Sequence, residues 1–124
     1  MPHEKSANPV LCNGGEFCAV GYDLGIQMSA SHDHKLSPAH GHLNLIGFVA
    51  LAVFGTYYAL TPVACHSRMA AIHYGFTTVT VLLLTPGIVM AITGKGQTPA
   101  QLGSILGALS MALFVLVVLH KGVG

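Results

Sequence analysis

The chain has 124 residues, of which 52% are hydrophobic and only 7% are charged, and its formal net charge is +1. Soluble domains carry about 25% charged residues, so this composition argues against a water-soluble domain and predicts an all-α integral membrane protein. The small net charge also argues against nucleic acid as a partner. The unusual feature is the eight histidines, twice the four aspartates and glutamates.

The first apolar segment covers residues 9–30 and contains a Gly21/Gly25 pair, a spacing that lets another helix approach closely. Its polar residues share one stripe, about 60° wide, of an α-helix. They are Cys12, Glu16, Asp23 and Gln27. We predict a transmembrane helix whose polar stripe turns into the protein. A surface amphipathic segment or an irregular loop is the alternative.

The second segment is predicted to be a helix over residues 39–61, after a connecting loop over 31–39. Pro38 suits the first turn of a helix, and the Thr61-Pro62 step ends the apolar run. Its roughly 20 apolar residues, at a rise of 1.5 Å each, suffice to cross a hydrocarbon core about 30 Å thick.

Two further apolar helices are predicted, over residues 69–93 and 99–119. Pro86 should kink the first of them, because proline cannot donate a backbone hydrogen bond. The second carries a ridge of small residues that suits helix packing in lipid. We therefore expect one transmembrane domain, a four-helix bundle over residues 1–124. The uneven distribution of Lys and Arg places both termini on the inner side.

His40 and His42 lie two positions apart where the second helix begins. At about 100° per residue they point to nearly opposite faces, so each can serve a different metal. A neutral imidazole nitrogen is an ordinary axial ligand of heme iron. Asn44 is a candidate hydrogen-bond partner for such a ligand. The alternatives are boundary histidines that reach water and an amide that only packs between helices.

The loop before the second helix holds His32 and His34 on either side of Asp33. Imidazole suits copper and zinc, so these two histidines are candidate metal ligands. A solvated loop is the alternative interpretation.

Glu16, Asp23 and His73 are ionisable residues within predicted membrane segments. Such residues often mark proton pathways, so we treat the three as a candidate proton path. For His73, a contact to a quinone or a simple packing role is an alternative. The two carboxylates are candidates only if the first segment enters the membrane.

The sequence from Pro38 through His40 and His42 to Phe48, Pro-Ala-His-Gly-His-Leu-Asn-Leu-Ile-Gly-Phe, resembles subunit I of the heme-copper oxidases, including the nitric-oxide-reductase branch. In that family an Ala-His sequence on one helix supplies a heme ligand, and a His-x-His pair on another serves two hemes on opposite faces. The resemblance is specific over residues 37–58 and extends elsewhere only to the length and order of the spans. The sequence has no adjacent His-His pair and no His-Pro-Glu motif, so the family's copper ligands have no counterpart.

The resemblance implies a membrane protein that binds heme, b-type, through His40 and His42, in the bacterial inner membrane. It implies electron transfer, or membership of a respiratory or oxidase-type complex, more than catalysis. It also implies a homotrimer, because subunit I resembles three four-helix units, with a heme between His40 of one subunit and His42 of its neighbour. Two alternatives remain open: a cofactor-free accessory subunit of a membrane complex, and a copper-binding membrane protein.

Overall fold

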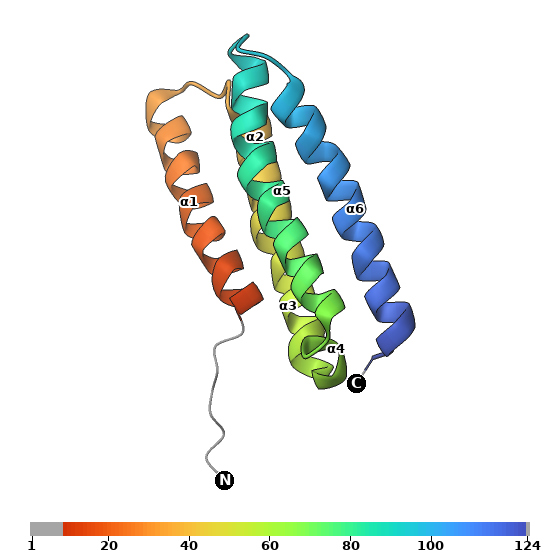
Figure 1. Cartoon of the computed structure of the whole chain (residues 1–124). Helices are drawn as coiled ribbons and strands as arrows, with labels where there is room; N and C mark the ends of the chain where they lie inside the picture. The colour runs from red at the N-terminus through yellow and green to blue at the C-terminus, as the bar shows by residue number, and fades with distance from the viewer. Residues whose placement is uncertain (1–8, 124) are drawn as a thin grey trace.

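The computed structural model describes residues 9–123 and their side chains from residue 14 onward. All regular secondary structure in this part of the chain is helical, which confirms the all-α prediction (Figure 1). The elements are α1 (Pro9–Ser31), α2 (Ser37–His42), η1 (Leu43–Ala50), α3 (Leu51–Leu60), α4 (Pro62–Cys65), α5 (Arg68–Ile92) and α6 (Thr98–Lys121).

The elements α2, η1 and α3 follow one another without a break and form one composite helix, Ser37–Leu60. Pro38 lies in its first turn, and the helix ends at Thr61, which leaves the helical conformation because Pro62 follows it. The middle part, η1, is a π-helix of eight residues. Its wider turns were not predicted from the sequence. Such turns are uncommon and often lie at functional sites.

Three helices are long and apolar enough to cross a membrane: Ser37–Leu60, Arg68–Ile92 and Thr98–Lys121. Their length and composition indicate a membrane protein in a lipid bilayer. The first segment does form a helix, α1, of 23 residues. It is not among the three, so the prediction of a fourth span is not supported. Its carboxylates and glycines lower its hydropathy below that of the other helices.

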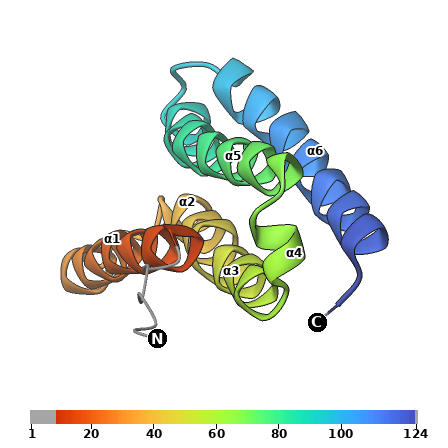
Figure 2. The same ribbon diagram turned by 60° about the horizontal axis from the view of Figure 1, so that its bottom comes forward.

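The helices alternate in direction, so α1 begins and α6 ends at the same end of the molecule, the lower end in Figure 1. The connections at residues 32–36 and 93–97 lie at the upper end. Seen from below, the order is α1, composite helix, α5, α6, in a bent row with α1 and α6 at its two ends (Figure 2). The arrangement is thus an open row of helices.

Close contact between α5 and α6 depends on small residues. A Cβ added at Gly103 would lie 2.8 Å from the Leu84 Cα, and one at Gly107 would lie 3.3 Å from a methyl carbon of Thr80. The small-residue ridge predicted on the last helix is therefore used, at these two glycines, for packing within the chain. In addition, α5 runs as one helix through Pro86.

The polar stripe of α1 faces outward, so the prediction that it turns into the protein is wrong for the single chain. Glu16, Asp23 and Gln27 are exposed, and the Gln27 amide donates to Asp23 Oδ2 at 2.8 Å. Glycine lets two helix backbones approach closely, so the glycine-rich face takes the inner position. The buried residues of that face are Gly14, Gly21 and Met28. The Cys12 side chain lies outside the described part.

At the lower end, the turn between α3 and α5 contains the one-turn helix α4. Ser67 then caps α5, its hydroxyl accepting from the Ala70 N–H at 3.2 Å. A core lies above this turn, between α3, α5 and α6, and fixes the lower half of the composite helix against its neighbours. Its fully buried members are Leu51, Phe54, Tyr58, Ala64, Ala70 and Val117.

Candidate functional site

His40 and His42 line two separate cavities on opposite sides of the composite helix, as their spacing predicts. The His40 cavity lies beside α1 and has a volume of about 470 Å³. The His42 cavity lies between the composite helix, α5 and α6 and has a volume of about 290 Å³. Both histidines are near the upper end, where α2 begins (Figure 1).

His40 is half-buried and contacts the side chain of Asn44, one turn further along. The amide nitrogen of Asn44 lies 3.1 Å from Nε2 and 3.4 Å from Nδ1 of the imidazole. An amide nitrogen only donates, so the nearer ring nitrogen accepts the hydrogen bond with its lone pair. Asn44 is therefore a hydrogen-bond partner of His40, and its role beside a metal ligand stays a prediction.

The glycine pair of α1 makes room for these two side chains. A Cβ added at Gly21 would overlap the Asn44 side-chain oxygen, and one at Gly25 would lie 3.1 Å from His40 Cε1. The close helix approach predicted from the pair is therefore present, and it packs the backbone of α1 directly on His40 and Asn44. The remaining lining of the His40 cavity is Cys18, Tyr22, Ile26, Ser29 and Phe48.

His42 is exposed, and a backbone carbonyl fixes its ring. Its Nδ1 lies 2.8 Å from the Pro38 carbonyl oxygen. A carbonyl only accepts, so Nδ1 carries the proton and Nε2 keeps a free lone pair. Histidines that bind metals commonly donate their other ring N–H to a carbonyl in this way. The described geometry thus holds His42 in the tautomer of a metal ligand.

The wall of the His42 cavity mixes apolar side chains with hydroxyls, a composition typical of binding sites for small molecules and cofactors. Four hydroxyl side chains from α5 and α6 line it: Thr77, Thr80, Ser104 and Ser110.

His73 lies in a different, closed environment between α3, α5 and α6, and only 1% of its surface is exposed. Its Nδ1 is 2.8 Å from the Tyr58 hydroxyl, whereas its Nε2 is buried without a hydrogen-bond partner. The rings of Phe54 and Phe114 pack against it, with centroids at 4.6 and 5.5 Å. Sequence reasoning selected His73 but missed Tyr58, because no motif links residues 15 positions apart across a turn.

The other predicted site residues are not brought together. His32 and His34 are exposed in the upper connection. No three His, Cys, Asp or Glu side chains in the described part of the chain converge to hold a metal ion. Glu16 and Asp23 are exposed on α1, whereas His73 is buried between α3, α5 and α6.

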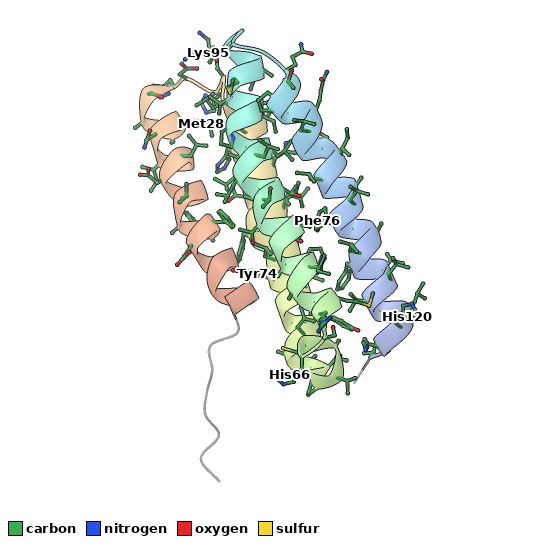
Figure 3. All side chains as sticks on the ribbon, in the orientation of Figure 1. Met28, His66, Tyr74, Phe76, Lys95 and His120 are labelled. Carbon is green, nitrogen blue, oxygen red and sulfur yellow. The ribbon has the colours of Figure 1, made fainter. Side chains whose placement is uncertain are left out.

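Two further histidines, His66 and His120, lie at the lower end of the molecule, opposite the end marked by Lys95 (Figure 3). They therefore belong to neither cavity.

Comparison with protein-family models, curated proteins and solved structures gave no match. The resemblance to oxidase subunit I therefore depends mainly on residues 37–58 of the sequence itself.

Proposed function

We propose that this protein binds heme within the membrane and transfers electrons, with His40 and His42 as axial ligands of heme iron. The observation that carries the proposal is the tautomer in which the fold holds the His42 imidazole. Its Nδ1–H donates to the Pro38 carbonyl, so Nε2 is free to bind a metal at the edge of a cavity between apolar helices.

The residues present fit such a group, with one adjustment at His40. The Asn44 amide nitrogen now lies 3.1 Å from Nε2 of His40. Iron binding at Nε2 would require this amide to move away from it, towards Nδ1, where the amide oxygen would accept from Nδ1–H, the arrangement common among metal-binding histidines. Bound heme would alternate between ferric and ferrous iron and so accept and pass on single electrons.

The sizes of the cavities bear on how many copies form one site. Cofactor sites usually enclose about 300–1,000 Å³, and the His42 cavity, with about 290 Å³, lies just below this range. A heme there needs a further wall. We propose that a second copy supplies it, in a homotrimer in which each heme lies between His42 of one subunit and His40 of the next. Closed symmetry is the usual arrangement of identical subunits.

The test is the heme content and the reduced-minus-oxidised visible spectrum of the purified full-length chain, produced with an adequate heme supply. We expect a low-spin spectrum from two histidine ligands. His40→Ala and His42→Ala should each abolish it, and His66→Ala, which removes a distant exposed histidine, should not. Wild-type heme content and spectrum in either the His40 or the His42 variant would contradict the ligand assignment.

Two further measurements separate the alternatives. Metal analysis that finds copper and no heme would favour a copper protein, and the absence of both would favour an accessory subunit. The mass of the detergent-solubilised complex tests the trimer independently of heme binding. A heme-loaded monomer would contradict the trimer and leave the proposal of heme binding intact.

A further inference from the structure

The buried imidazole of His73 carries a polar atom that the fold leaves without a partner. Its Nδ1 contacts the Tyr58 hydroxyl at 2.8 Å, but Nε2 contacts no hydrogen-bonding group of the described residues. Leaving such a group unsatisfied costs about 1–3 kcal/mol. In a membrane segment, an ionisable residue held at this cost marks a functional site more often than a structural one.

The His42 cavity extends down to the turn of α5 above His73, which does not itself line the cavity. Thr77 and Ser110 line its lower part, and Thr77 lies one helical turn from His73. The Thr77 hydroxyl donates to the His73 carbonyl at 2.9 Å, so the Ser110 hydroxyl must be the donor in the contact between the two hydroxyls. Both oxygens therefore keep lone pairs that can accept from water in the cavity.

The cavity has room for that water. One buried water needs about 10–15 Å³ of probe volume and two to four polar partners, and the cavity offers about 290 Å³ and four hydroxyls. Ser104 and Ser110 are about 9 Å apart along α6, so the hydroxyls extend along the cavity rather than gather at one point. The Phe54 ring lines the cavity and also packs against His73, and it forms the partition between them.

On its other side His73 contacts Tyr58, a buried residue near the lower end of α3. Tyr58 lies two residues before α3 ends at Leu60, about 3 Å along the helix axis. The imidazole therefore lies between a hydroxyl-lined cavity above and a tyrosine hydroxyl near the lower end of α3.

We propose that His73 and Tyr58 transfer protons between the His42 cavity and the lower membrane surface. Both side chains are buried, and the Phe54 ring separates His73 from the cavity, so the transfer requires a movement of these rings that admits water. A proton from cavity water then binds Nε2, the proton on Nδ1 passes to the Tyr58 oxygen, and the original hydroxyl proton of Tyr58 passes to water at the lower end of the helices. The imidazole ends neutral with its proton on Nε2. The cycle repeats when the side chain reorients so that Nε2–H meets the Tyr58 oxygen and Nδ1 faces the cavity, and when the Tyr58 hydroxyl turns away from the imidazole. One proton has then passed from the cavity to the far side of His73.

The experiment uses the full-length protein reconstituted into lipid vesicles that contain a pH-sensitive dye. A potassium gradient with valinomycin imposes the membrane potential. We expect faster acidification than in protein-free vesicles. Tyr58→Phe, which removes one oxygen atom and keeps the ring, should reduce the rate to that of protein-free vesicles, and so should His73→Gln.

Matched controls come from neighbouring residues that lie outside the route. Tyr57→Phe removes a hydroxyl that donates to the Gly122 carbonyl at 2.7 Å, and His66→Gln removes an exposed histidine. Both should keep the wild-type rate. Wild-type flux equal to that of protein-free vesicles would overturn the proposal, and so would flux that survives in Tyr58→Phe or falls equally in Tyr57→Phe. The measurement requires no heme, so its failure leaves the heme proposal unaffected.

Discussion

Replacement of Gly103 by alanine tests how closely α5 and α6 must approach. A Cβ built at Gly103 lies 2.8 Å from both Cα and Cβ of Leu84 and 3.0 Å from its backbone nitrogen. A change of rotamer cannot relieve contacts with backbone atoms. The two helices must therefore separate around this point, which also disturbs the hydroxyl contacts lower in the same interface.

The expected size of the effect follows from two opposing terms. Overpacking of this kind costs about 1–3 kcal/mol, whereas replacing glycine by alanine within a helix gains about 1 kcal/mol. Gly75 is exposed on α5, and a Cβ there meets no atom within 4 Å. Gly75→Ala therefore shows only the gain in helix propensity. The free energy of unfolding of Gly103→Ala should lie about 1–3 kcal/mol below that of Gly75→Ala.

The assay is unfolding of the full-length chain in mixed micelles by increasing mole fractions of sodium dodecyl sulfate, followed by far-ultraviolet circular dichroism. Gly103→Ala should unfold at a lower fraction of the denaturing detergent than Gly75→Ala. Equal midpoints would refute the reasoning, because they would mean that α5 and α6 are not in backbone contact at Leu84.

Two more predictions concern the first cavity and the orientation in the membrane. Gly21→Ala should displace the Asn44 amide that donates to His40 and so change the ¹⁵N chemical shifts of that imidazole. Gly15→Ala, which has open space around the added carbon, should leave these shifts unchanged. Unaltered His40 shifts in Gly21→Ala would contradict the described packing. In single-cysteine variants, Cys65 and a cysteine at Lys35 should react with a membrane-impermeant maleimide from opposite sides of the bilayer, since they lie at opposite ends of the composite helix. Labelling from one side only would rule out this arrangement.

The helices could be predicted from the sequence because uninterrupted apolar runs and proline steps mark them. The last helix was expected over 99–119 and runs over Thr98–Lys121. The contact between His40 and Asn44 could also be predicted, because residues four apart lie on one face of a helix. Local patterns of this kind need no knowledge of the neighbouring helices.

What depends on neighbouring helices could not be predicted in the same way. The polar stripe of α1 was assigned to the interior because a carboxylate in lipid is costly, but Gly21 and Gly25 determine which face meets the composite helix. The pair of Tyr58 and His73 depends on how α3 and α5 meet after the turn at α4. The π-helix depends on a hydrogen-bond register that is not marked by any residue type.

The π-helix determines how the composite helix should respond to a scan of substitutions. In an α-helix, each step of four residues overshoots a full turn by about 40°, so three such steps drift by about 120°. In the composite helix, residues 42, 46, 50 and 54 nevertheless line one cavity, and residues 40, 44 and 48 line the other. The wider turns of η1 cancel the drift and keep both rows straight. Sensitivity to substitution along this helix should therefore repeat every fourth residue. Deletion of one residue within η1 should turn the side chains after the deletion by about a quarter-turn, away from the cavities they now line.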